Sequence, residues 1–344
     1  MKAKRPSPPS VTLKDISEAT GLSIPSVSRI LGNPETAALY NEKTQARVRE
    51  AALQMGYRPN RLAKAVRNNE TRQVGLIVHQ DKRNLAPTYH SADFLAGITE
   101  RLEAAGYTGV IVPMELLEKN EEEVRQVFSE KFADAFIMLA FLQPNLLSRF
   151  EEIVREPTVW CDANVRKDRL CVYRNEVKAG ELAGRNLRLR HGKALLLDRI
   201  RVASVNAAYR EERRKGAFKA LKERGAEIEI LGRDPETDDW HGELLDFLRQ
   251  GYDLVAQEYT AALQALNAGL TGGLVAGRDF NLVCSDDINL FARFLSQISR
   301  SSFDRVDAGR IAADMALEAI AGGNPADAAC VVPRWLEGNT NRAG

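Results

Sequence analysis

The chain has few histidines and cysteines, and no apolar run reaches the length that spans a bilayer. The four histidines lack helical metal-ligand spacing, and the four cysteines form no C-x-x-C pair, so we expect no metal and reduced thiols. The first ten residues, "MKAKRPSPPS", are basic and lack the apolar stretch of a secretory signal. These absences argue against a membrane protein or an exported disulfide scaffold, and we expect a cytoplasmic protein.

Sequence signatures of catalysis are also missing. No glycine-rich phosphate loop follows the first apolar strand, and neither G-x-S-x-G nor H-E-x-x-H occurs. We therefore expect a binding protein without a cofactor rather than an enzyme.

Net charge is almost zero over 344 residues, but it is distributed unevenly. Residues 1–70 hold twelve basic and six acidic residues, a net charge of +6, whereas the rest carries −5, since the whole is +1. A basic segment before an acidic one suits contact with phosphates. On charge alone, a solvated basic surface is an equally good interpretation.

Residues 11–32 have the pattern of two short helices. Thr12 is a good N-cap with Asp15 at the capping-box position, and Gly21 ends the first helix. Ser23 caps the second, and Pro25 falls in its first turn, where a missing N–H costs little. Two short helices joined by a glycine-containing turn predict a helix-turn-helix.

The second of these helices has an outward face that a core helix would not need. Val27 and Leu31 are expected to pack inward, with Ile30 beside them. The outward face then holds Ile24, Pro25, Ser26, Ser28 and Arg29. Arg29 can donate two hydrogen bonds to a guanine edge, and Ser28 suits a phosphate. The alternative is an ordinary helical hairpin in a core.

Asn41 caps a third predicted helix, and "GYRPNRLAKAV" (56–66) predicts a short basic helix before a polar linker. From residue 73 the pattern alternates between apolar strands and helices, which indicates parallel sheets covered on both faces. Ligands in such sheets bind beyond the carboxyl ends of the strands. Three of the predicted strands end in the polar stretches "CDAN", "QEYT" and "CSDD".

The segments "VTLKDISEATGLSIPSVSRIL", "EKTQARVREAALQMGYRPNRLAKAV" and "VGLIV" strongly resemble the lactose-repressor/galactose-repressor (LacI/GalR) family of bacterial transcription regulators. The resemblance covers the helical head closely and the rest more weakly, to about residue 340. It implies an all-α helix-turn-helix head and an α/β body like a periplasmic binding protein, with two parallel-sheet subdomains. It also implies a homodimer on a pseudo-palindromic double-stranded DNA operator.

By this resemblance Ile24, Pro25 and Arg29 read bases, and Val66 takes the position of a minor-groove wedge. The loop 32–40 is a few residues longer than the family pattern. The candidate DNA-binding residues are Thr12, Ser23, Ile24, Pro25, Ser26, Ser28, Arg29, Asn41, Thr44, Tyr57, Asn60, Ala63 and Val66.

The resemblance also implies an effector site in a cleft between the subdomains. Its candidate residues are Asp162, Arg213, Trp240, Gln257 and Asp286. Carboxylates, an amide and an arginine suit sugar hydroxyls, and a tryptophan suits an apolar sugar face. For three of them a structural role is the alternative: an N-cap for Asp286, a solvated face for Arg213, and the core for Trp240.

The sequence departs from the family pattern in the body. "QE" (257–258) replaces the usual "ND", "FLSQIS" (294–299) replaces a "PLTT"-like segment, and the first strand is followed by a long basic loop. These departures indicate an unusual ligand, bulkier or anionic, with Lys82 and Arg83 as candidates for an acidic group.

The expected organisation is a DNA-binding domain at 11–58, a hinge helix and linker at 59–72, and an effector-binding and dimerisation domain at 73–340. Its subdomains are expected at 73–174 with 300–327 and at 175–299 with 328–340. The predicted function is a ligand-responsive regulator, most simply a repressor, controlled by a small sugar or sugar derivative and without a membrane partner. The alternative is a stand-alone sugar-binding protein.

Overall fold

The computed structural model describes residues 11–32, 34–58, 70–79, 91–140, 142–162, 169–199, 207–233, 240–287 and 298–342. The chain divides into two compact units, Met1–Thr71 and Arg72–Gly344, which we call the head and the body. Most of the expected hinge helix, residues 59–69, lies outside the described residues.

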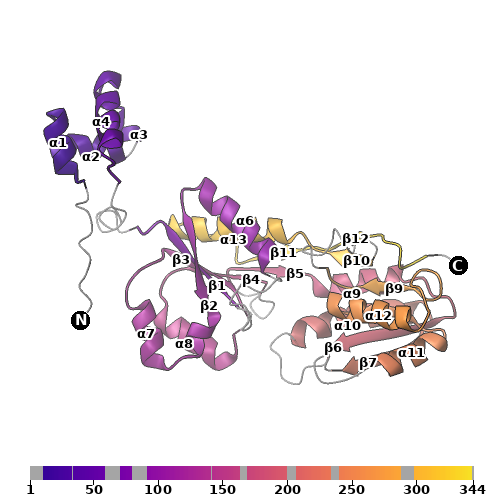
Figure 1. The fold of residues 1–344 in the computed structure, drawn as a ribbon. Coiled ribbons are helices and arrows are strands. Elements are labelled where there is room, and N and C mark those ends of the chain that lie inside the picture. The colour runs from indigo at the N-terminus through magenta and orange to yellow at the C-terminus, as the bar shows by residue number, and fades with distance from the viewer. Residues whose placement is uncertain are drawn as a thin grey trace, which may run out of the picture. The chain divides into compact units, whose positions relative to one another are not determined.

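The described part of the head is made of short helices (Figure 1), and the first and last of them begin at good capping residues. Thr12 and Asp15 form the predicted capping box, and Gly21 ends the first helix with a φ of 67°. Asn41 caps the last helix by accepting from the Thr44 amide at 2.8 Å. The helices are α1 (Leu13–Thr20), α2 (Ile24–Gly32), α3 (Pro34–Ala37) and α4 (Glu42–Gln54).

The core of the head is small and comes from three helices. Its buried side chains are Ile16, Val27, Ile30, Val48 and Ala52. The sequence analysis expected Leu31 to pack inward with Ile30 beside it, but Ile30 is the buried residue and Leu31 is only partly buried. It also missed α3, which lies in the long segment before α4.

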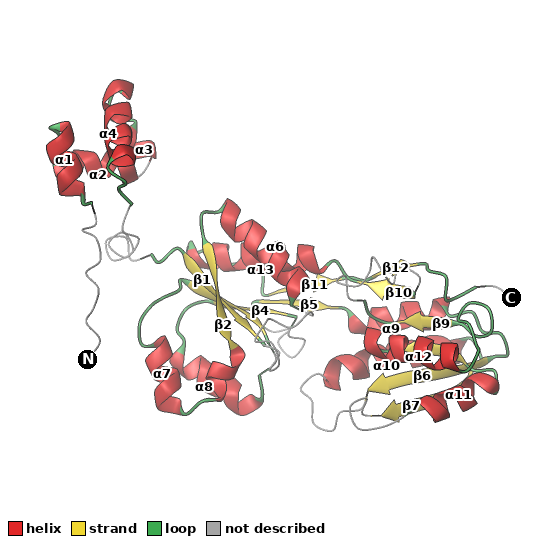
Figure 2. Ribbon diagram, in the orientation of Figure 1, coloured by secondary structure: helices red, strands yellow, loops and turns green. Residues whose placement is uncertain are grey.

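The body contains two six-stranded sheets (Figure 2). The first is entirely parallel, in the order β11-β5-β4-β3-β1-β2. Its strands are β1 (Gln73–Val78), β2 (Thr108–Pro113), β3 (Ala135–Leu139), β4 (Thr158–Cys161), β5 (Cys171–Arg174) and β11 (Ala328–Val331). The helical elements that cover its two faces are α6 (Ala92–Ala104) with α13 (Arg305–Ile320), and η1 (Met114–Glu118) with α7 (Glu121–Phe128) and α8 (Pro144–Ile153).

The second sheet has the order β12-β10-β9-β8-β6-β7, and only β12 is antiparallel to its neighbour. Its strands are β6 (Lys193–Arg199), β7 (Glu227–Arg233), β8 (Asp253–Ala256), β9 (Leu282–Cys284), β10 (Ser299–Ser302) and β12 (Arg334–Leu336). Its helices are α9 (Glu176–Asn186) with α10 (Ala207–Glu223) on one face, and α11 (His241–Arg249) with α12 (Tyr259–Thr271) on the other.

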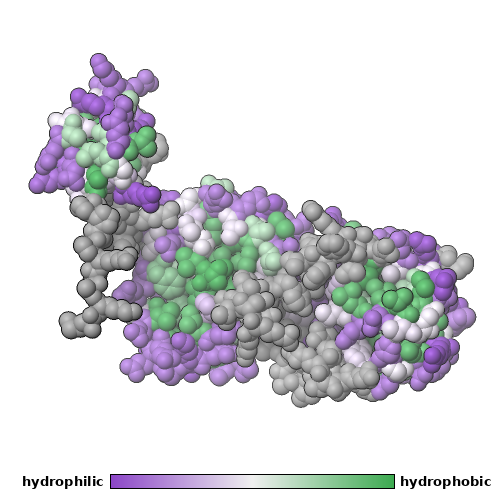
Figure 3. Space-filling model, in the orientation of Figure 1, coloured by the Kyte–Doolittle hydropathy of each residue, from purple (hydrophilic) through white to green (hydrophobic). Residues whose placement is uncertain are grey.

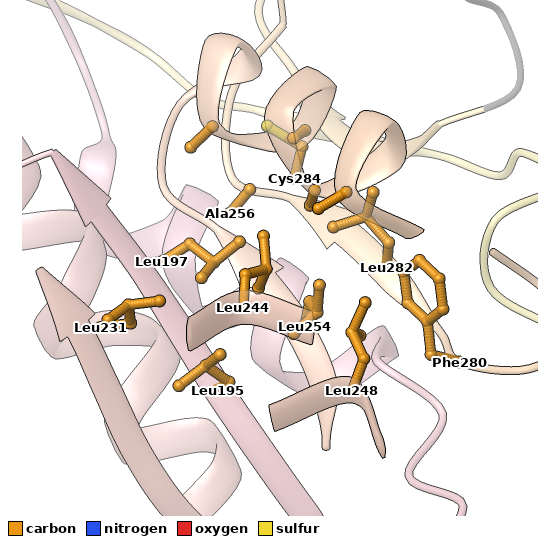
Figure 4. Close-up of a cluster of buried hydrophobic side chains, with 14 of the residues drawn as sticks. Leu195, Leu197, Leu231, Leu244, Leu248, Leu254, Ala256, Phe280, Leu282 and Cys284 are labelled. Atoms are coloured by element: carbon orange, nitrogen blue, oxygen red, sulfur yellow. The ribbon is translucent and has the colours of Figure 1, made fainter. Parts of the chain in front are cut away.

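The buried side chains of the second sheet alternate between its faces, as the pleat requires. Leu195, Leu197, Leu254 and Ala256 point toward α11 and α12, where leucines of α11 meet them (Figure 4). Leu196 and its neighbours point toward α9 and α10. On the face seen in Figure 3, apolar side chains gather over the first sheet and over α12.

Three crossovers join the two sheets, after β5, after β10 and after β11. The second and third crossovers show that the expected subdomain limits at 300 and 328 are wrong by a few residues. Strand β10 belongs to the second sheet because it pairs with β9, and β11 belongs to the first because it pairs with β5. Both strands are too short to show periodicity in the sequence, so only their pairing assigns them. None of the described helices is both long and apolar enough to cross a bilayer.

Candidate nucleic-acid and ligand sites

The outward face of α2 is as the sequence predicts. Ile24 is 44% exposed, Pro25 and Arg29 are also exposed, and Val27 between them is fully buried. Ser26 and Ser28 are half-buried at the border of this face. Two apolar side chains in the first turn of the helix and one arginine in its last turn are therefore exposed, and they can meet a groove surface.

Thr12, Ser23, Ser26, Asn41 and Thr44, among the polar candidates of the head, lie at helix starts. The Ser23 hydroxyl lies 2.9 Å from that of Ser26, and the Thr12 hydroxyl donates to the Asp15 carboxylate at 2.8 Å. Asn41 and Thr44 form the start of α4. Backbone amides at helix N-termini can donate to phosphates, so these positions suit contacts with the DNA backbone. Tyr57 is half-buried against the core of the head.

Tyr40 is a neighbour of Arg29 that the sequence analysis missed. Hydrogen bonds with Ser26 and Arg29 lower the pKa of the Tyr40 phenol. The Thr36 hydroxyl donates to the Arg29 carbonyl at 2.9 Å. Both residues come from the long segment between α2 and α4, so this segment helps to position Arg29. Asn60, Ala63 and Val66, with Lys82 and Arg83, lie outside the described residues.

In the body, three predicted effector residues meet in one network of buried charges. At its centre is a closed ring of Arg174, Glu176, Arg213 and Asp286, which we call the charge ring. Its four nitrogen–oxygen contacts measure 3.1 Å (Arg174–Glu176), 2.5 Å (Glu176–Arg213), 3.1 Å (Arg213–Asp286) and 3.2 Å (Asp286–Arg174). The ring alternates in sign, so every charge has two opposite neighbours.

The ring continues in two directions. Asp162, after β4, binds the Arg174 Nε at 2.5 Å. Arg305, the first residue of α13, binds Asp286 at 2.5 Å and Asp287 at 2.6 Å. The network therefore links carboxylates that follow β4 and β9, one in each sheet, through side chains at the first two crossovers.

Burial and charge act in opposite directions on these groups. Burial would raise the pKa of Asp286, but Arg213, Arg305 and Arg174 outweigh it, and the pKa lies well below its usual range. Burial raises the pKa of Glu176, although Arg174 and Arg213 oppose the shift. Since Asp286 receives three guanidinium groups, it is the charge on which the network depends.

A second group of polar side chains lies beside the ring, at the carboxyl ends of three adjacent strands. The Gln257 amide donates to the Leu197 carbonyl, and the Ser285 amide to the Ala256 carbonyl, so the register of β6, β8 and β9 continues by one residue. Asp198, Gln257 and Ser285 therefore point to the same face, toward α10. We call them the polar row.

The polar row is buried but only partly hydrogen-bonded. Gln257 is fully buried, and neither atom of its side-chain amide has a hydrogen-bond partner within the described ranges. The same holds for the Ser285 hydroxyl and for one carboxylate oxygen of Asp198. The backbone carbonyl of Gln257 accepts from Arg213 at 2.7 Å, which connects the row to the charge ring.

Trp240 is the predicted effector residue that the structure does not bring to this network. It is buried in the apolar cluster of the second sheet, on the face covered by α11 and α12. Gln257 points to the opposite face. The indole N–H of Trp240 is buried without a hydrogen-bond partner in the described part of the chain. Its expected role in stacking on a ligand stays a prediction.

The sequence analysis missed Arg174, Glu176 and Arg305. Each stands at a strand end or helix start beside a crossover, where sequence alone does not tell which sheet it will face. In the described segments, no set of three or more His, Cys, Asp or Glu side chains is placed to hold a metal ion.

The fold and these two sites define a class of protein: a helix-turn-helix head joined to a two-sheet α/β body with a polar site at its strand ends. Family models agree. Residues 12–60 match "Bacterial regulatory proteins, lacI family", and residues 71–279 match "Periplasmic binding proteins and sugar binding domain of LacI family". The chain belongs to the LacI family, and it is a transcriptional regulator, not an enzyme.

Similar proteins include the HTH-type transcriptional regulator AglR of Rhizobium meliloti, 28% identical over 81% of this chain and 78% of the relative. The repressor PurR of Aliivibrio salmonicida is 24% identical over 90% of this chain and 92% of the relative. A Lac repressor dimer bound to operator and the anti-inducer ONPF has the same fold, with a TM-score of 0.73 at 18% identity, covering 97% of this chain and 100% of that chain.

A complex of the transcriptional regulator CelR with cellobiose also shares the fold, with a TM-score of 0.60 at 18% identity, covering 96% of this chain and 99% of that chain.

Proposed function

We propose that this protein is a cytoplasmic repressor that binds a pseudo-palindromic operator as a homodimer and responds to a small, hydroxyl-rich effector. The observation that carries the ligand response is the side-chain amide of Gln257. It is wholly buried, and it makes no hydrogen bond within the described part of the chain. A buried amide without partners costs about 1–3 kcal/mol, which a ligand that bonds to it would recover.

The chemistry of the polar row suggests the ligand class. Gln257 offers two donors and an acceptor, Ser285 offers a hydroxyl, and Asp198 offers a carboxylate oxygen. Adjacent hydroxyls of a sugar or sugar derivative match this mixture of donors and acceptors. Arg210 Nε lies 4.0 Å from Asp198, so a basic group is also close.

The ligand proposal is tested with the variant Gln257→Met. We screen sugars and sugar acids by thermal shift on the full chain and then compare the variant with the wild type. Since Met fills a similar volume and needs no hydrogen bonds, ligand-free stability should stay equal or rise. The shift from the active compound should be lost. A variant that responds as well as the wild type would place the ligand elsewhere.

The exposed face of α2 supports the DNA-binding part. We select fragments from a genomic library at moderate ionic strength and measure affinity for the best fragment. Arg29→Ala should then cost about 1–3 kcal/mol on that fragment and much less on random duplex. An equal loss on both would assign Arg29 to phosphate. A dimer that prefers no fragment, with every candidate metabolite tried, would favour the stand-alone binding protein.

The switch we propose is the segment 59–69, which would fold as a hinge helix on DNA. Its sequence is short and polar, and such a segment is not a stable isolated helix. Hydrogen exchange of its amides should slow only in the operator complex. Equal protection without DNA would rule this switch out.

A further inference from the structure

Arg174 stands at the first crossover of the body. It is the last residue of β5 in the first sheet, and the chain continues from it into α9, which covers the second sheet. The residue is only 6% exposed. A guanidinium group at this depth needs strong partners on several sides.

Three carboxylates surround this guanidinium group. Asp162 accepts two hydrogen bonds from one edge of the group, from Nε at 2.5 Å and from an Nη at 3.3 Å. Asp286 accepts from the other Nη at 3.2 and 3.3 Å, and Glu176 lies 3.1 Å away. Every nitrogen of the fork therefore has a carboxylate oxygen within reach, which is the geometry that favours arginine over lysine.

Two aromatic rings complete the surroundings. The Arg174 guanidinium carbon lies 5.1 Å from the ring centre of Phe303 and 5.7 Å from that of Tyr209. Both distances are within the range of cation–π attraction. Tyr209 belongs to α10 of the second sheet, and Phe303 lies in the second crossover. Carboxylates and rings of this kind form a site for a planar cation.

Each sheet of the body, with the helices that cover it, forms one half of the body. We propose that residues from both halves form a guanidinium-binding site, and that Arg174 fills it as a ligand tethered to the chain. Asp162 comes from the first half, and Asp286 and Tyr209 come from the second. The arginine side chain thus joins the two halves across the crossovers, as a bound ligand would. Arg213 also contacts Glu176 and Asp286, and Arg305 also contacts Asp286, whereas Asp162 pairs with Arg174.

The backbone conformation of Asp162 indicates that contacts within the site stabilise its structure. Asp162 has a φ of 62°, in the left-handed region that is uncommon outside glycine. Its side chain binds Arg174, and its carbonyl accepts a hydrogen bond from the Tyr209 hydroxyl. Contacts from both halves thus stabilise an unfavourable backbone conformation at this position.

The consequence for regulation rests on the proposed function, whereas the guanidinium site itself does not. An effector that uses the Asp286 carboxylate must compete with Arg174. The tethered side chain therefore favours the effector-free arrangement, and its loss should make the effector bind more tightly.

Chemical rescue tests the site without DNA or effector. In the full-length Arg174→Ala variant the site loses its cation, and free methylguanidinium should replace it. We measure the melting midpoint with methylguanidinium on the order of 10 mM, far below the molar range that unfolds proteins. At a concentration about ten times its dissociation constant, methylguanidinium should raise the midpoint of the variant by about 2 °C. Sodium chloride at equal ionic strength should not raise the midpoint.

Two controls make the result specific. The wild type, whose site is filled, should not gain stability from methylguanidinium. Arg169→Ala removes a half-exposed arginine of the same half that pairs with Glu151, and it should show no rescue either. Rescue of Arg169→Ala to the same degree, or none of Arg174→Ala, would overturn the proposal.

Arg174→Lys provides an answer if the alanine variant does not fold. Lysine keeps the charge but loses the planar fork and its stacking, so its melting midpoint should fall clearly below that of the wild type. An unchanged midpoint would contradict a guanidinium site. Because neither test involves DNA or effector, failure here is distinct from failure of the proposed repressor.

Discussion

At the scale of single residues, Asp286 is the charged group whose removal should destabilise the body most. It binds three arginines, from β5, α10 and α13, and it is only 6% exposed. Removing one partner of a buried ion pair leaves uncompensated charge and costs about 3–5 kcal/mol. We therefore expect Asp286→Asn to lower the free energy of unfolding of the body by about this amount near neutral pH.

The pH dependence of this loss follows from the pKa of Asp286. Because the folded state lowers that pKa, its contribution is complete above the ordinary aspartate value of about 3.9 and is lost as the pH falls further. The stability gap between wild type and Asp286→Asn should shrink below about pH 4, by up to about 1.4 kcal/mol per pH unit.

Urea unfolding of both proteins between pH 7 and pH 3 measures the gap. Glu176 has a raised pKa and acts in the opposite direction, and the Asp286 charge contributes to that rise, so Glu176 offsets part of the shrinkage of the gap. A gap that stays constant down to pH 3 would show that Asp286 is not stabilised in its charged form.

At the scale of elements, the close pairing of α9 and α10 positions the charge ring. A Cβ on Gly180 would lie 1.9 Å from the Arg213 carbonyl, and one on Gly216 would lie 2.0 Å from the Val177 carbonyl. Glycine at both positions lets the two backbones touch, so Glu176 at the start of α9 reaches Arg213 on α10. Larger residues would separate the helices and stretch this ion pair.

Gly180→Ala tests this packing. The added methyl group would clash with backbone, which cannot move like a flexible side chain, so we expect a loss of about 1–3 kcal/mol in unfolding free energy. Gly242→Ala is the matched control, since it lies in α11 with nothing within 4 Å of the added Cβ. It should be neutral or stabilise slightly, because alanine favours helix. Equal effects of the two variants would refute the packing argument.

At the scale of the whole molecule, the uneven charge predicts how DNA binding depends on salt. By the proposed function, the net charge of +6 in residues 1–70 would contact phosphates, and the −5 of the remainder would not. If a dimer contacts about four phosphates, its affinity for random duplex should fall roughly a hundredfold between 50 and 200 mM salt.

The free energy of unfolding of the body is the control in the same salt range. It should change little, because the charge ring is buried and exposed ion pairs contribute little. An affinity that does not depend on salt would argue against phosphate contacts by the head.

The sequence predicted the head in most of its detail because the determinants are local. Thr12 and Asp15, three residues apart, form a cap at the start of a helix, and helical periodicity alone buries Val27 two residues from the exposed Arg29. The alternation of strands and helices in the body is equally local. The sequence also predicted three strands that end in polar residues, and these residues follow β4, β8 and β9.

Only the tertiary structure decided which of these polar residues meet. Arg174 and Asp286 are 112 positions apart, and they pair because the crossover after β5 carries one strand end toward the other sheet. The tertiary structure also places β10 and β11 each in the sheet opposite to the one expected. It places Trp240 on the face of the second sheet that α11 and α12 cover. An ion pair between distant residues depends on strand order and crossovers, which local periodicity does not encode.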